Sequence, residues 1–117
     1  MTSLRMLITR LKGENLDWSK KEKILSLLGL AQRAGKLITG EEQVVFAIQN
    51  KEAKLVFLSQ DTGKHTTKKI ATKTTIHKVA LSTDMTSLEL SQAIGKSRKV
   101  VAVIDEGFAQ KMRSMME

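Results

Sequence analysis

Apolar side chains recur every three or four positions in several stretches, which is the spacing of one face of an α-helix. The first stretch runs from about 19 to 34, and Ser19 and Glu22 mark its start. This pair is the signature of a capping box, in which each side chain bonds the other residue's backbone N–H. Similar spacing predicts helices over about 41–50, 63–73, 86–94 and 108–116, with a second capping box at Thr86 and Glu89.

Two continuous apolar runs, 55–58 and 100–104, are bounded by turn residues. Such short runs predict strands that are buried on both faces. Shorter strands are expected at 37–39 and 76–81. Because helices alternate with strands, and two strands need cover on both faces, the pattern predicts an α/β protein with a three-layer α/β/α sandwich. This architecture hosts many functions and indicates no particular one.

The chain has 117 residues, which is typical of one domain. We expect residues 18–117 to form that domain and residues 1–17 to be an N-terminal extension. No apolar stretch approaches the roughly 18 residues of a membrane span, and the N-terminal stretch lacks the cleavage site of a secretory signal. The chain contains no Cys, which fits a reducing compartment, so a cytoplasmic location is expected.

The formal net charge is +8, and the positive charge is spread through the folded pattern rather than gathered in a tail. Residues 18–36 and 61–80 each carry +4, and residues 96–117 carry +2. A small domain this basic commonly binds a polyanion. Nucleic acid is the first interpretation and an anionic membrane surface the second, while a charge that only maintains solubility remains the alternative.

The residue types that support catalysis or metal binding are scarce. With no Cys and only His65 and His77, a metal site is not expected. The Gly63-Lys64 pair resembles part of a phosphate loop, but Leu58 and His65 occupy positions where that motif requires Gly and Ser or Thr. No nucleophile–base pair stands out. We therefore expect no enzyme activity, no cofactor and no small-molecule substrate.

The start of the predicted helix at 41–50 is the most informative stretch. Gly40 precedes three polar residues, and a helix start of this kind can approach phosphates or base edges closely. If the valines and Ile48 of this helix face inward, Phe46 points outward. An outward Phe could stack on a base, or it could pack under the N-terminal extension.

Three segments, Gly40–Val56, Leu88–Gly95 and Val100–Gly107, resemble the kink-turn RNA-binding ribosomal proteins of the L-seven-Ae / L-thirty-e family. The stretches Leu28–Lys36 and Val103–Ala109 are similar to the bacterial YlxQ branch of that family. The similarity spans about residues 18–116. It implies a four-stranded mixed sheet, binding to structured RNA, typically a kink-turn, and association with ribosomal RNA or the ribosome.

The resemblance also implies which residues touch RNA. The family reads Gly-x-Asn-Glu in the first helical turn, with a Lys further along the helix and a loop before the last strand. These positions correspond here to the following residues: Gly40, Glu41, Glu42, Gln43, Phe46, Lys96, Ser97, Arg98 and Lys99.

Two of these positions depart from the family pattern, because Glu42 replaces an amide and Phe46 replaces a cation. We expect Lys36, Arg98 and Lys99 to supply phosphate contacts instead. The predicted surface joins Gly40–Gln43, Lys36 and the loop Lys96–Lys99. A protein-interaction module of the same fold is the alternative, which Phe46 and the acidic Glu41-Glu42 pair favour.

Overall fold

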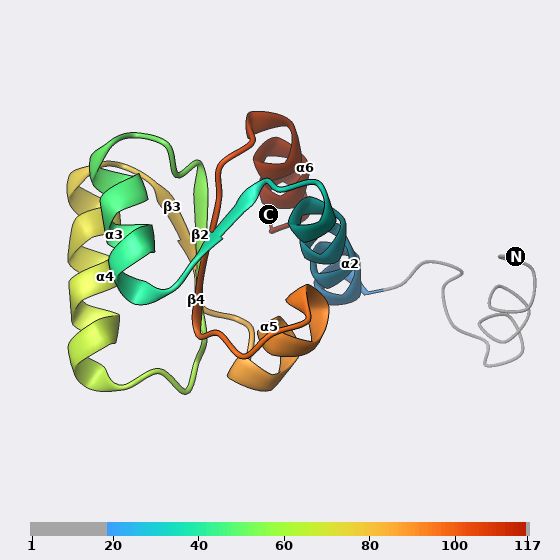
Figure 1. Ribbon diagram of the computed structural model, residues 1–117, viewed down its shortest axis with the longest axis horizontal. Helices are drawn as coiled ribbons and strands as arrows, with labels where there is room; N and C mark the ends of the chain where they lie inside the picture. The colour runs from blue at the N-terminus through green and yellow to red at the C-terminus, as the bar shows by residue number, and fades with distance from the viewer. Residues whose placement is uncertain (1–18, 117) are drawn as a thin grey trace, which may run out of the picture.

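The computed structural model describes residues 19–116, in which helices and strands alternate (Figure 1). The predicted extension at 1–17 lies outside the described residues, as do Trp18 and Glu117. The elements are, in chain order, α2 (Lys20–Arg33), β1 (Leu37–Thr39), α3 (Glu41–Gln49), β2 (Leu55–Leu58), α4 (Lys64–Ile76), β3 (Ala80–Ser82), α5 (Ser87–Ile94), β4 (Val100–Val103) and α6 (Glu106–Met116).

The strands form one four-stranded sheet in the order β1-β4-β2-β3. β4 is antiparallel to both β1 and β2, whereas β2 and β3 are parallel. Thr39 pairs with Val101, and Val56 pairs with Ala102. The central strands β2 and β4 are buried along their whole length, as the two apolar runs predict. The mixed sheet that the family resemblance implies is confirmed.

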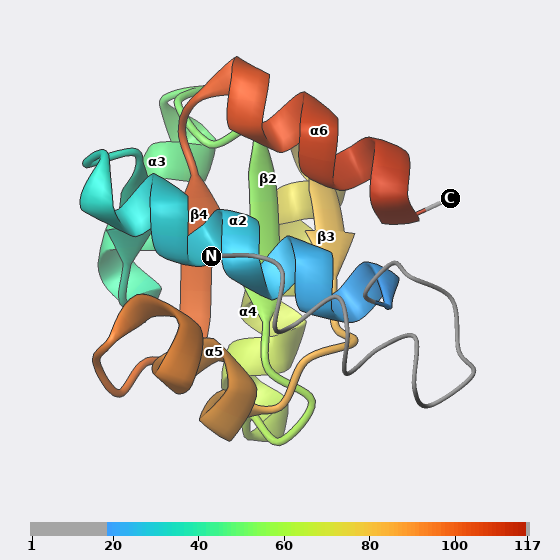
Figure 2. The same ribbon diagram turned by 90° about the vertical axis from the view of Figure 1, so that its right-hand side faces the viewer.

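Helices cover both faces of this sheet. α3 and α4 lie on one face, and α2, α5 and α6 lie on the other (Figures 1 and 2). Successive strand residues point to opposite faces, so Val56 packs into one core beside Val44 and Ile70. Phe57 packs into the other, which it shares with residues of α2, α5 and α6. The predicted three-layer sandwich is therefore confirmed.

Local sequence signals determine where α2 and α5 begin. Glu22 N–H donates to Ser19 Oγ over 3.2 Å, and Ser19 N–H donates to Glu22 Oε1 over 3.2 Å. The second capping box is also present, with 3.1 Å from Glu89 N–H to Thr86 Oγ1 and 2.9 Å from Thr86 N–H to Glu89 Oε1. Both capping-box predictions are confirmed.

The strand predicted at 76–81 is present but its bounds are wrong, because α4 continues to Ile76 and β3 is Ala80–Ser82. Thr74 is buried against the core in the last turn of α4, and its Oγ1 donates to Ile70 O of the same helix over 2.9 Å. Ile76 is an exposed helical residue rather than part of an alternating strand. Within residues 19–116, no helix has the length and apolar character needed to cross a bilayer.

Candidate functional site

Two segments that are far apart in the sequence meet at one end of the sheet. Because β1 and β4 are antiparallel, the end of β1 lies beside the start of β4. Gly40 N–H donates to Val100 O over 3.1 Å, and Arg98 Nε donates to Thr39 Oγ1 over 3.2 Å. We call Gly40–Gln43 together with Lys96–Lys99 the loop edge. The predicted proximity of these two segments is confirmed.

The first turn of α3 depends on a glycine. Gly40 has φ 99° and ψ 145°, a conformation that is essentially restricted to glycine. A Cβ at this position would lie 2.7 Å from Gln43 Oε1, so the Gln43 side chain folds back over the glycine. Gln43 and Glu42 are both exposed. The turn therefore presents the Gln43 amide and the Glu42 carboxylate to solvent, with the Gln43 side chain lying over the backbone of Gly40.

Glu41 is held by the neighbouring helix α4. Thr66 Oγ1 donates to Glu41 Oε1 over 2.9 Å, and Lys69 Nζ lies 3.2 Å from Glu41 Oε2. The hydrogen bond from Thr66, followed by that from Lys69, lowers the pKa of Glu41 below its ordinary value. Glu41 is thus a structural contact between α3 and α4, which leaves Glu42 and Gln43 as the side chains of this turn that can meet a ligand.

The loop Lys96–Lys99 is fixed by its backbone. Arg98 N–H donates to Ser91 Oγ over 3.2 Å, and Ser59 N–H donates to Lys99 O over 2.9 Å. All four loop residues are exposed. Within the described part of the chain, no carboxylate forms an ion pair with a cation of this loop. The loop therefore presents three positive charges from a fixed backbone, with no ion-pair partner among residues 19–116.

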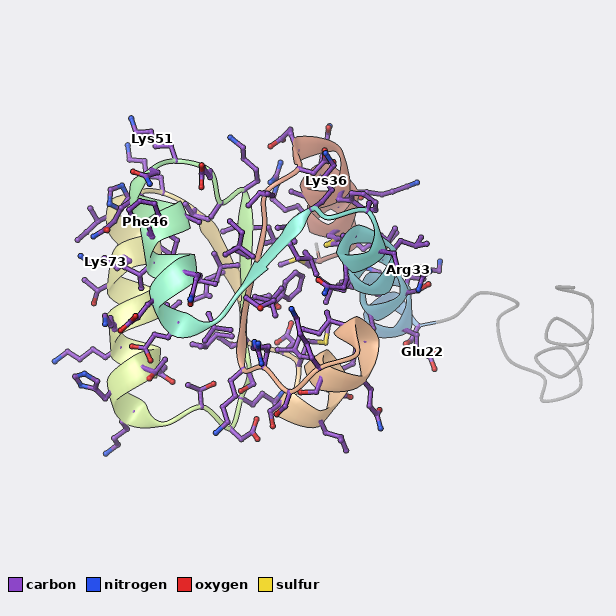
Figure 3. The ribbon with its side chains drawn as sticks, in the orientation of Figure 1. Glu22, Arg33, Lys36, Phe46, Lys51 and Lys73 are labelled. Atoms are coloured by element: carbon purple, nitrogen blue, oxygen red, sulfur yellow. The ribbon has the colours of Figure 1, made fainter. Side chains whose placement is uncertain are left out.

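Phe46 points outward from α3, as predicted, and 64% of it is exposed. Together with Ile38, Glu42, Gln43 and Glu52 it lines a shallow cleft of about 510 Å³. Figure 3 shows Phe46 on the outer side of α3, away from the sheet. An aromatic surface thus lies directly beside the loop edge.

The structure does not bring Lys36 to the loop edge. Lys36 precedes β1, whereas Gly40 follows it, and Lys36 O accepts from Ile104 N–H over 3.0 Å. Figure 3 shows Lys36 at the opposite end of the sheet from the start of α3. The predicted continuous surface is therefore wrong with respect to Lys36, because β1 separates it from the other residues.

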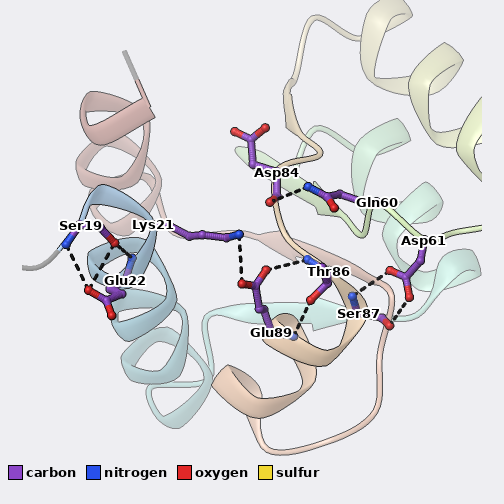
Figure 4. A network of polar contacts seen from close by, with 9 residues as sticks. All are labelled: Ser19, Lys21, Glu22, Gln60, Asp61, Asp84, Thr86, Ser87 and Glu89. Atoms are coloured by element: carbon purple, nitrogen blue, oxygen red, sulfur yellow. Dashed lines mark hydrogen bonds and ion pairs between the residues drawn. The ribbon is translucent and has the colours of Figure 1, made fainter.

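A further contact at this end of the sheet was not predicted. Ser87 Oγ and N–H donate to the two carboxylate oxygens of Asp61 over 2.6 Å and 2.9 Å (Figure 4). These hydrogen bonds, that from the Ser87 hydroxyl first, lower the pKa of Asp61 to about 2. The contact ties the β2–α4 loop to the start of α5. Asp61 and Ser87 are 26 residues apart, so no local sequence pattern could have indicated it.

The chemistry available at the loop edge is that of binding. Guanidinium and ammonium groups can contact phosphates, while an amide and a carboxylate can meet base edges. Among residues 19–116, no group of three His, Asp or Glu side chains is placed to hold a metal ion. His65 lies in the first turn of α4 and His77 just after its end.

Comparison with known proteins gives the class to which this fold and surface belong. The sequence model of the Ribosomal protein L7Ae/L30e/S12e/Gadd45 family matches residues 22–113, and the chain belongs to this family. The resemblance inferred from the sequence motifs is thereby confirmed.

Two relatives carry the name RNA-binding protein YlxQ. The protein from Enterococcus faecium is 42% identical over 102 residues, which cover 87% of this chain and 99% of the relative. The protein from Bacillus subtilis (strain 168) is 44% identical over 92 residues, which cover 78% and 92%. A solved structure of a protein of unknown function from Bacillus halodurans C is 46% identical, with a TM-score of 0.78, and the match covers 80% of this chain and 96% of that one.

Proposed function

We propose that this chain binds structured RNA through the loop edge. The observation that carries the proposal is the bond from Arg98 Nε to Thr39 Oγ1, which holds a guanidinium beside the first turn of α3. Phosphate-binding and base-reading groups thus share one edge. Membership of the L7Ae family and the name RNA-binding protein, which two YlxQ relatives carry, support RNA as the ligand.

The two parts of the edge have different roles in this proposal. Lys96, Arg98 and Lys99 contact phosphates and supply affinity that depends on salt. Gln43 can donate to and accept from a base edge, and the Glu42 carboxylate can accept from the N–H groups of guanine. The RNA we propose is a kink-turn, in which a hinged internal loop exposes guanine edges, and ribosomal RNA is its proposed source.

The experiment compares two RNA hairpins of equal length, one with a kink-turn internal loop and one fully paired. The protein should bind the first more tightly. Gln43→Ala should reduce this preference more than it reduces overall affinity, because base contacts specify and phosphate contacts position. Gln49→Ala changes an exposed glutamine at the far end of the same helix and serves as the control. Equal binding of both hairpins by the parent protein would refute the kink-turn proposal.

A second pair of substitutions tests the departures from the family pattern. Glu42→Asn restores an amide donor, and Phe46→Lys adds a cation on the outer side of α3. The double variant should prefer the kink-turn hairpin more strongly than the parent does. If its preference is unchanged, α3 does not contact the RNA in the manner proposed.

A protein-interaction module is the second candidate, because Phe46 is exposed beside the apolar side chain of Ile38. The two candidate functions predict that different molecules co-purify with the protein from cells. RNA binding predicts that the purified protein becomes smaller in solution after ribonuclease treatment. Two results together would favour the second candidate. Ribonuclease would leave the size of the purified protein unchanged, and a protein that co-purifies with the parent would be lost from Phe46→Ser.

A further inference from the structure

Lys36 lies with three other lysines at the opposite end of the sheet from the loop edge. We call Lys36, Lys51, Lys54 and Lys78 the far cluster. The last three line one cleft of about 340 Å³. Lys36 joins them through the end of β4, since Ile104 N–H donates to Lys36 O and Lys54 N–H donates to Val103 O. Lys36 and Lys51 both lie along the upper side of Figure 3.

The backbone at two of these lysines is unusual. Lys51 has φ 63° and Lys78 has φ 58°, and within residues 19–116 they are the non-glycine residues with positive φ. Each follows the C-terminal residue that caps a helix, α3 and α4 respectively, where a left-handed residue is usually glycine. The left-handed conformation is disfavoured about tenfold for a residue with a Cβ. At both helix ends that line this cleft, a residue with a Cβ thus occupies a disfavoured backbone conformation.

Attraction to the helix dipole does not account for these lysines. A cation at an exposed helix C-terminus favours folding by about two- to fivefold, which is less than the conformational penalty. Both residues are nevertheless lysine rather than glycine. Fold stability alone therefore does not explain why lysine rather than glycine occupies these two positions.

The cleft is positively charged and its one acid is already paired. Glu106 Oε2 lies 2.8 Å from Arg113 Nη2, and Arg113 Nη1 donates to Lys54 O over 3.1 Å. Lys54 Nζ donates to Lys51 O over 3.3 Å, which keeps its ammonium group at the cleft. Within the described residues, no carboxylate forms an ion pair with a lysine of the far cluster. Its partner must therefore supply negative charge.

We propose that the far cluster is a second RNA-binding surface, so that the protein bridges two RNA segments; this rests on the function proposed above. The far cluster and the loop edge lie at opposite ends of β1 and β4. In this proposal one RNA segment is bound at each of these ends. The far cluster contacts the phosphate backbone without regard to sequence, because it offers ammonium groups and no base-reading amide.

The test uses an immobilised kink-turn hairpin, the protein, and a second, fluorescently labelled RNA duplex of unrelated sequence. The parent protein should bind the hairpin and then retain the labelled duplex. Lys51→Gly/Lys78→Gly should still bind the hairpin but hold the duplex about 30-fold more weakly at about 0.1 M salt, as the loss of two phosphate contacts implies. Its melting temperature should equal or exceed that of the parent, because glycine adopts positive φ without penalty.

A matched control, Lys20→Gln/Lys23→Gln, removes the same charge from the first turns of α2 and should retain the duplex. A parent protein that is captured by the hairpin but leaves the duplex in solution would overturn the bridging proposal alone. So would a glycine variant that retains the duplex as well as the parent does. A protein that the hairpin fails to capture would instead contradict the proposed function, and bridging with it.

Discussion

Removing the cations of Arg98 and Lys99 keeps the backbone contacts of their loop, although it also removes the bond from Arg98 Nε to Thr39 Oγ1. The loop is anchored through the backbone of these two residues, by Ser91 Oγ and by Ser59 N–H. Both side chains are exposed. In Arg98→Ala/Lys99→Ala, the change at Lys99 should alter the free energy of unfolding by no more than about 0.5 kcal/mol. The change at Arg98 should cost about 0.5–1.5 kcal/mol, because it also removes the bond to Thr39. The salt dependence of RNA binding then separates the loss of the charges from the loss of the bond to Thr39, because only the lost charges change the slope.

The size of that change follows from counterion release. Each phosphate contact contributes about 0.7–0.9 to the slope of log affinity against log salt. If the loop edge and its surroundings neutralise about three to five phosphates, the slope for the parent is roughly −2 to −4. Losing two contacts should make the slope shallower by about 1.5 and weaken binding about 30-fold at about 0.1 M salt, or about 2 kcal/mol.

Fluorescence anisotropy with a labelled kink-turn hairpin, repeated from about 0.05 to 0.3 M salt, measures both quantities. The double variant should lose affinity for every RNA tested, because phosphate contacts carry no sequence information. Lys20→Gln/Lys23→Gln removes the same charge elsewhere and should leave the slope nearly unchanged. The reasoning is refuted if the loop variant keeps the parental slope, whatever its affinity, since the loop cations then release no counterions.

Three further predictions concern the framework of the site. The pKa of Asp61 is about 2 in the fold and 3.8 ordinarily, so its ionised form stabilises the fold above about pH 4 and this contribution is lost as the pH falls towards 2. The melting temperature of Asp61→Asn should accordingly lie below that of the parent at pH 6, and the gap should close near pH 2; a gap that is constant with pH would contradict the Ser87 contact. Gly40→Ala forces a side chain into a glycine conformation and should cost about 1–3 kcal/mol in urea unfolding, with weaker RNA binding; an unchanged midpoint would mean that the turn adopts another conformation. Phe57 is fully buried, and Phe57→Ala should cost about 3–5 kcal/mol, measured by the same method; a cost below about 1 kcal/mol would show that the core around β2 collapses into the space.

Several elements were predictable because short sequence segments encode them. The capping boxes at Ser19 and Thr86 involve residues three positions apart, so their geometry is local. The runs of β2 and β4 have no polar face, which is possible only for strands covered on both sides. The end of α4 was not predictable in this way. Lys78 closes that helix in a conformation usually taken by glycine, so the sequence carries no stop signal there.

The sequence by itself thus determined the class of fold, the outward position of Phe46 and the family to which the chain belongs. Only the tertiary structure decided which charges act together. Arg98 reaches Thr39 across 59 residues, and Lys69 engages Glu41 through helix packing. Lys36 is four residues from Gly40 in the chain and yet lies at the other end of the sheet. The physical reason is that an extended strand carries its two ends apart, whereas strand pairing, which depends on the packing of the whole core, brings distant segments together.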